Sequence, residues 1–198
     1  KARIAAARLE LACLPATASL AHTMGAAVAD FPDYFIASEP LDLAPSTEVG
    51  FDALLASAGG GELSYSLAAP KWQFLCWACD RHEVVLHGTG NPSITLFEPN
   101  QPIDATEFGS RKAVFAASDG IWPIYFAILD RQRYAMSLNN AAVRRRHADG
   151  SSGAPHYFFS LSAQALAQRP FRAGWVYLLP RESFVPQPPL REPHGQIE

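Results

Sequence analysis

This sequence has few cysteines and a small net charge. Three cysteines occur among 198 residues, an odd and small number for a secreted domain held by disulfides, so we expect a reducing, cytoplasmic environment, with a secreted effector as the alternative. The formal net charge at pH 7 is −3, which gives no reason to expect nucleic acid or an acidic membrane as a partner of the whole molecule. No apolar run approaches the roughly 20 residues that cross a bilayer. With 48% hydrophobic and 18% charged residues, the composition is that of a globular protein.

The first third of the sequence has the pattern of short helices. Alanine and leucine recur with helical spacing, and prolines divide the region into pieces. The expected helices cover residues 2–13, 17–29 and 47–57. The glycine run after Ala58 predicts a flexible break. The expected organisation is therefore a helical N-terminal region over 1–70, a second domain over 71–190 and an extended tail over 191–198.

From residue 71 the pattern changes to one amphipathic helix followed by short strands. The helix is expected over 71–82, and the stretches after it are rich in β-branched and aromatic residues. The expected strands cover 83–88, 93–99, 112–118, 133–140, 156–162 and 174–180. A further helix over 119–131 has Asp119 in position to cap its N-terminus and Pro123 near its start. This pattern predicts an α+β fold with a mainly antiparallel sheet.

Cys76 and Cys79 form a C-x-x-C pair, the spacing of a redox dithiol or of half a zinc site. Zinc needs four ligands, and only His82 and His87 lie close to the pair in the sequence. We therefore expect no metal site. The preferred interpretation is that both cysteines are small apolar side chains on the buried face of a helix.

A second cluster is basic. Arg144, Arg145 and Arg146 precede a loop-forming stretch, and adjacent arginines can contact the phosphates of RNA or of a nucleotide. The alternative interpretation is the solvated tip of a hairpin. His156, which starts an expected strand, is interpreted as a strand residue without a functional role.

The stretch "VVLHGTG" places a histidine, two glycines and a threonine at the end of an expected strand. A lone G-x-G is weak evidence for a dinucleotide site, and no long helix follows it, so the Rossmann interpretation fails. A strand that ends in His87, Gly88 and Thr89 nevertheless presents an imidazole, backbone polar groups and a hydroxyl together. Because Gly88 has no Cβ, we expect a ligand to approach closely there. The stretch predicts the rim of a binding site.

The order of three short elements resembles the ADP-ribosyltransferase superfamily. The first is "VVLHGTG", similar to the H-G-T or H-G-S strand that opens the NAD pocket of that family. The second is "KAVFAASDGIWPIYFAI", similar to a later pocket-lining strand followed by a helix with a stacking tyrosine. The third is "GWVYLLPRESFVPQP", similar to the V-Y strand and polar turn of small members of the family. The resemblance covers residues 72–190 and implies an ADP-ribosyltransferase-like split sheet.

The resemblance also implies roles for individual residues. His87 would form a hydrogen bond with a ribose hydroxyl of NAD, and the Gly88 backbone would form hydrogen bonds with the carboxamide. Thr89 would reach a ribose or phosphate oxygen. Phe115 would line the pocket and Tyr125 would stack on the nicotinamide ring. The implied reaction cleaves the nicotinamide–ribose bond through an oxocarbenium-like ribose, which a nearby carboxylate stabilises.

Two positions depart from the family pattern. Val114 stands where many members have tyrosine, and Gly174 stands where polymerase-type members have the catalytic glutamate. The third catalytic residue is then Glu182, or the position is taken by Gln187, or it is absent. The expected function is transfer of ADP-ribose from NAD to a protein, nucleic acid or small molecule, or NAD hydrolysis. The alternatives are a noncatalytic nucleotide- or protein-binding module of the same fold and an RNA 2′-phosphotransferase-like enzyme.

Overall fold

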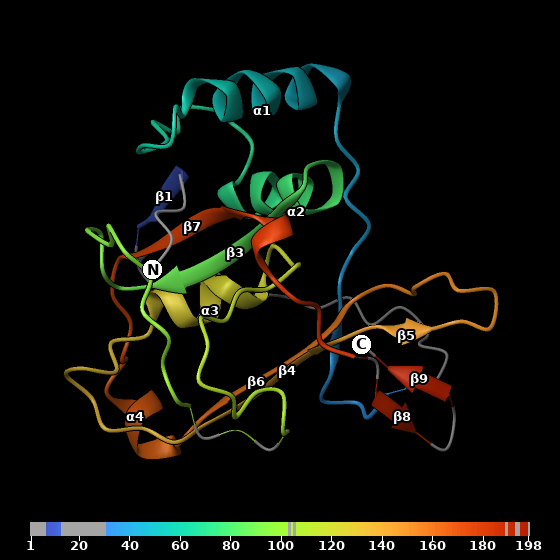
Figure 1. Cartoon of the computed structure of the whole chain (residues 1–198). Coiled ribbons are helices and arrows are strands. Elements are labelled where there is room, and N and C mark those ends of the chain that lie inside the picture. The colour runs from blue at the N-terminus through green and yellow to red at the C-terminus, as the bar shows by residue number, and fades with distance from the viewer. Residues whose placement is uncertain are drawn as a thin grey trace. The chain divides into compact units, whose positions relative to one another are not determined.

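The computed structural model (Figure 1) describes residues 7–12, 31–102, 104 and 106–188, and the backbone of 190–192 and 195–197. These residues form two compact units. The first contains 41–130 and 171–187 together with the strand at 7–11, and the second contains the described parts of 12–40, 131–170 and 188–198. All paired strands are antiparallel, and together with the helices they make the α+β class that the sequence predicts.

The first unit is built on a sheet of three strands in the order β1 (Ala7–Leu11), β7 (Gly174–Pro180) and β3 (Val84–Thr89). β7 is central, so both of its edges are paired. Its register with β3 places His87 opposite Tyr177 and Thr89 opposite Trp175. Pairing with β7, which is nearly fully buried, therefore holds both ends of β3 in position.

Three helices complete the first unit: α1 (Pro45–Ser57), α2 (Lys71–Arg81) and α3 (Trp122–Ile128), with a short 3₁₀ turn η1 at Arg181–Ser183. Figure 1 shows α1 beside α2, and the ring of Phe51 on α1 meets those of Phe74 and Trp77 on α2 at centroid distances of 5.4 Å. The main core joins these rings to Leu86 and Val176 of the sheet. Burial of these aromatic and aliphatic side chains stabilises the unit.

The second unit contains two small sheets. One has the order β2 (Ile36–Ala37), β6 (His156–Leu161) and β4 (Leu138–Val143), and β6 and β4 run side by side in Figure 1. The other pairs β5 (Arg145–Arg146), β9 (Gly195–Ile197) and β8 (Leu190–Glu192). A short helix, α4 (Ala163–Ala167), follows β6. Because only two residues of β2 pair with β6, its edge adds little to the sheet.

Several predicted elements are confirmed. The helices expected over 47–57 and 71–82 are α1 and α2, and the strands expected over 83–88, 156–162 and 174–180 are β3, β6 and β7. The helix expected over 119–131 is the shorter α3. The Asp119 carboxylate accepts hydrogen bonds from the backbone N–H groups of Ile121 and Trp122 at 2.8 and 2.7 Å, so it holds the turn that begins this helix.

Other predictions are wrong. The helix expected over 2–13 is a strand at 7–11, where buried Leu9 alternates with Arg8 and Glu10. A stretch this short fits the helical spacing of apolar residues as well as the alternation of a strand, and pairing with β7 makes it a strand. No strand forms over 93–99, and only isolated bridges form at Ala113 and Ala117 within 112–118. The strand expected over 133–140 begins at Leu138. The helix expected over 17–29 lies outside the described residues. In the tail the described backbone forms strands at 190–192 and 195–197 that pair with each other.

Candidate functional site

His87 occupies a half-buried position near the end of β3. Its Nδ1–H donates a hydrogen bond of 2.7 Å to the carbonyl of Phe115, and its ring meets the ring of Phe97 edge to face at a centroid distance of 5.2 Å. Burial lowers the pKa of His87, although the bond to Phe115 opposes this shift. A neutral imidazole that donates through Nδ1 keeps an acceptor lone pair on Nε2. The side chain is therefore suited to accept a hydrogen bond from a hydroxyl group.

The backbone of β3 is partly open on the edge that faces away from β7. Leu86 exchanges two backbone hydrogen bonds of 2.8 Å with Ala117 on this edge. Backbone groups alternate in direction along a strand, so the N–H and C=O of Gly88 point to the same edge. Among the described residues, no protein partner bonds Gly88 there. This leaves one donor and one acceptor side by side at the end of the strand.

The side-chain face of Gly88 is closed by α3. A Cβ built on Gly88 would overlap the carbonyl of Pro123, and one built on Gly174 would overlap the carbonyl of Ala127. Both glycines thus allow the backbone of α3 to lie directly on the sheet. The expectation that the missing Gly88 side chain leaves space for a ligand is wrong for this face. The same contact excludes a glutamate at Gly174 in this arrangement.

The turn after β3 is held by polar contacts that the sequence did not reveal. The Thr89 hydroxyl accepts a hydrogen bond from the Asn91 N–H at 3.2 Å, and Asn91 Oδ1 accepts one from the Ser93 N–H at 2.9 Å. The hydroxyl of buried Tyr177 accepts from the Ile94 N–H at 3.0 Å and donates to the Asn91 carbonyl at 3.1 Å. A strand pattern alone marks Tyr177 as core, so its role in fixing this turn had no sequence signal.

The rings of the two aromatic residues predicted for the site pack against other residues and not on the imidazole ring. Phe115 contacts His87 through its carbonyl, while its ring packs against Phe108 at 6.3 Å between centroids. Tyr125 lies on α3 beside Phe126. Neighbouring residues of a strand project to opposite faces, and α3 covers the Gly88 face, so the His87 ring and α3 lie on opposite faces of the sheet.

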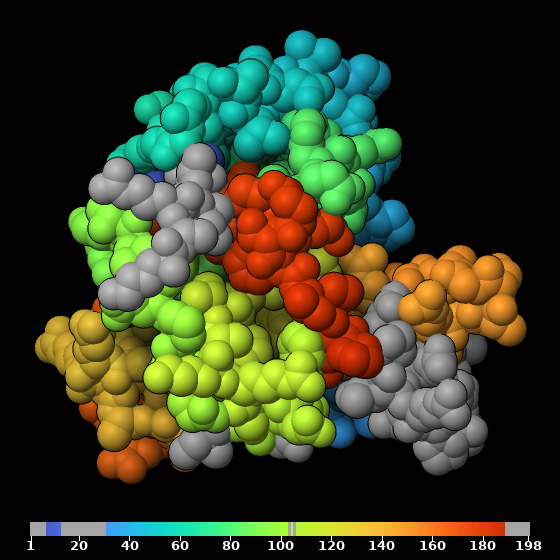
Figure 2. Space-filling view, in the orientation of Figure 1, coloured from blue at the N-terminus to red at the C-terminus, as the bar shows by residue number. Residues whose placement is uncertain are grey.

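Glu182 lies beyond the other end of β3, and Gln187 follows it in the sequence. Pro180 pairs with Val84, at the start of β3, and Glu182 follows in the exposed turn η1. Glu182 is five residues beyond the partner of His87, on the order of 15 Å of extended backbone. Gln187 is exposed in an irregular stretch, and Figure 2 shows residues 181–188, coloured red, at the surface. The structure brings His87, Gly88 and Thr89 together and places Glu182 after the strand end that pairs with the start of β3.

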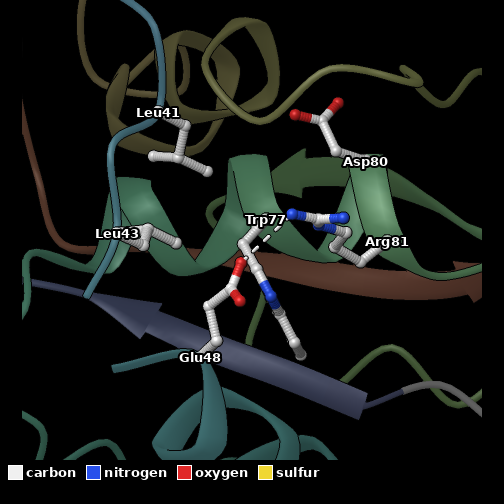
Figure 3. Close-up of a pocket in the computed structure, with 6 residues that line it drawn as sticks. All are labelled: Leu41, Leu43, Glu48, Trp77, Asp80 and Arg81. Carbon is white, nitrogen blue, oxygen red and sulfur yellow. Dashed lines mark hydrogen bonds and ion pairs between the residues drawn. The ribbon is translucent and has the colours of Figure 1, made fainter. Parts of the chain in front are cut away.

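A shallow pocket of about 210 Å³ lies elsewhere in the first unit (Figure 3). Its lining residues are Leu41, Leu43, Glu48, Trp77, Asp80 and Arg81. Glu48 and Arg81 form an ion pair of 3.3 Å across it, as Figure 3 shows. None of the predicted site residues lines this pocket. It therefore does not bear on the site at the end of β3.

The cysteine pair and the arginine cluster lie apart from the end of β3 in the sequence, and their contacts differ. Burial raises the pKa of the Cys79 thiol strongly, with Asp119 adding to the effect, so this thiol is a poor nucleophile and ligand. Cys76 and Cys79 form no disulfide, and the described residues contain no group of three side chains suited to a metal ion. Arg145 packs its guanidinium over the ring of Phe31 at 5.2 Å. Within the described residues, no helix is long and apolar enough to cross a membrane.

Comparison with protein-family models, with curated proteins and with solved structures finds no match for this chain.

Proposed function

We propose that this chain binds NAD at the H-G-T end of β3 and cleaves the nicotinamide–ribose bond, passing ADP-ribose to an acceptor or to water. The observation that carries the proposal is the free backbone edge of Gly88. A primary carboxamide carries an acceptor oxygen and an NH₂ donor on the same carbon, and the N–H and C=O of one strand residue match them. Such backbone recognition favours an amide-bearing ring over a sugar or a simple anion.

The neighbouring residues supply groups that suit the rest of a nicotinamide nucleoside. Neutral His87 offers Nε2 as an acceptor for a ribose hydroxyl. Thr89, at the strand end, offers a hydroxyl beside it. These three consecutive residues act on one small region of a ligand, because the backbone of a paired strand is rigid. Fixed positioning of the reacting bond is a large part of catalysis in such a reaction.

A second candidate is a noncatalytic module that binds NAD without cleaving it. It is favoured by the placement of the carboxylates: Gly174 has no room for one, and Glu182 lies beyond the far end of β3. The loss of a transition-state charge contact costs about 3 kcal/mol, which corresponds to roughly a hundredfold in rate. Turnover in this candidate is absent while the affinity for NAD remains.

Nicotinamide release and NAD affinity, measured on the same samples, separate the two candidates. We expect wild type to bind NAD and release nicotinamide, and His87→Ala to lose release by about a hundredfold or more. Glu182→Gln serves as the variant of the exposed carboxylate, and thermal melting confirms that each variant is folded. Binding without release in wild type selects the noncatalytic module. No binding of NAD by folded wild type contradicts both candidates.

A further inference from the structure

Arg172 differs from the other half-buried arginines of the first unit in its contacts. Arg8 bonds Glu62 at 3.2 Å and lies over the ring of Trp175, and Arg181 donates to backbone carbonyls. Arg172 has one acidic neighbour among the described residues, Asp130, at 3.6 Å. Its Nε is buried without an acceptor, as are those of Arg8 and Arg181, but unlike them its guanidinium makes no hydrogen bond to a described residue. A guanidinium group has five N–H donors in a planar fork. Arg172 therefore has unused donors.

The position of Arg172 places these donors at the end of the H-G-T strand. A Cβ on Gly90 would overlap the guanidinium, so the group lies flat against this glycine, one residue after Thr89. The backbone of Arg172 is anchored by a hydrogen bond of 2.7 Å from its N–H to the carbonyl of Ile128. Its side chain is 27% exposed, and that of Asp130 is 19% exposed. The guanidinium is thus held in place but remains reachable from solvent.

We propose that Arg172 is an anion-binding residue that takes a phosphate group, and that in the NAD complex it holds the pyrophosphate. Two phosphate oxygens can accept hydrogen bonds from two N–H groups of one guanidinium. The Asp130 carboxylate, at 3.6 Å, is too far from Arg172 to form such hydrogen bonds. The nucleotide part of this inference rests on the proposed function. The anion part rests on Arg172, Asp130 and Gly90 alone.

The pair with Asp130 predicts an effect that a purely structural arginine would not have. Asp130 holds Arg172 when the site is empty and repels an anion that approaches it. Replacement by asparagine removes that repulsion while it keeps the shape of the side chain. We expect Asp130→Asn to bind inorganic pyrophosphate several-fold more tightly than wild type.

The test measures binding of inorganic pyrophosphate, ADP-ribose, NAD and nicotinamide riboside by calorimetry. We expect Arg172→Gln to weaken binding of the three phosphate-bearing ligands by about tenfold or more and to leave nicotinamide riboside unchanged. Gly90→Ala, whose methyl group displaces the guanidinium without a change of charge, should act in the same direction. Arg8→Gln is the matched control, because it removes a half-buried, ion-paired arginine of the same unit. Melting curves confirm folding.

The outcomes distinguish failure of the anion site at Arg172 from failure of the proposed NAD-binding function. Unchanged affinity of Arg172→Gln for pyrophosphate and ADP-ribose overturns the anion site, even where NAD still binds. Equal losses in Arg172→Gln and Arg8→Gln overturn it as well, because the effect is then one of net charge. Pyrophosphate binding that depends on Arg172 in a chain that does not bind NAD supports the anion site and removes the proposed function.

Discussion

The hydroxyl of Tyr177 donates a hydrogen bond to the carbonyl of Asn91 at 3.1 Å, across 86 residues of sequence. The same hydroxyl accepts from the Ile94 N–H at 3.0 Å. Because Tyr177 stands opposite His87 in the sheet, this buried oxygen ties the turn after the H-G-T strand to the centre of the sheet. The turn is therefore positioned by the fold and not by its own sequence alone.

Tyr177→Phe tests this tie. The variant keeps the ring and its contact with Phe97 but leaves the Asn91 carbonyl and the Ile94 N–H without their partner. We expect the free energy of unfolding to fall by about 1–3 kcal/mol, and chemical denaturation measures it. Tyr65→Phe is the control, because that hydroxyl makes one bond, to the Ala69 carbonyl at 2.6 Å. An equal, small loss in both variants would remove the special role of Tyr177.

Gly88→Ala tests the packing of α3 on the sheet. The added methyl group overlaps the carbonyl of Pro123, which belongs to helix backbone and has little freedom to move. We expect a loss of about 1–3 kcal/mol in the free energy of unfolding, as for other overpacked cores. Gly61→Ala is the control, since the nearest atom to its Cβ, the Ala58 carbonyl oxygen, is 3.4 Å away. A Gly88→Ala variant as stable as Gly61→Ala contradicts this arrangement.

The regular elements with a single clear periodicity could be predicted from the sequence. The stretch 174–180 is apolar on both faces because β7 is paired on both edges and covered on both sides, so its composition alone indicates a strand. The short stretch 7–11 fits two periods equally, and only its pairing with β7 makes it a strand. Residues 93–99 have strand-like composition, yet they pair with no neighbouring strand, and the Ile94 N–H bonds the Tyr177 hydroxyl instead. Tertiary contacts decided these two stretches.

The candidate site was predicted only where it follows the strand itself. His87, Gly88 and Thr89 are consecutive, so one correct strand brings them together. Glu182 belongs to another segment, and its position depends on the register of β7, which the sequence does not specify. Arg172 and Asp130 are distant in sequence and meet through the bridge between Leu129 and Phe171. Contacts of this kind have no local sequence pattern.

Alkylation tests the interpretation of the C-x-x-C pair. Burial raises the pKa of Cys79, so the reactive thiolate form is suppressed in the folded protein. We expect iodoacetamide at pH 8 to leave Cys79 unmodified in native protein and to modify it in urea, with the sites assigned by mass spectrometry. Free cysteine in the same tube gives the reference rate. Rapid native modification of Cys79 would return the redox dithiol as an explanation.

The pH dependence of stability tests the buried, neutral state of His87. Burial lowers the pKa of His87 below its ordinary value of 6.5, so below that pH the unfolded chain binds more protons at this side chain than the folded one. Its contribution to stability is full above the unfolded pKa, is lost as the pH falls towards the folded pKa, and is constant below it.

We therefore expect the free energy of unfolding of wild type to decrease between pH 7.5 and 5.5. In His87→Gln the decrease should be smaller, although that variant is less stable at pH 7.5 because its side chain fills the space beside Phe97 less well. His147→Gln, which removes an exposed histidine of the second unit, is measured in parallel for comparison. If His87→Gln retains the full slope, the imidazole is not held neutral by the fold, and its Nε2 is not reserved as an acceptor.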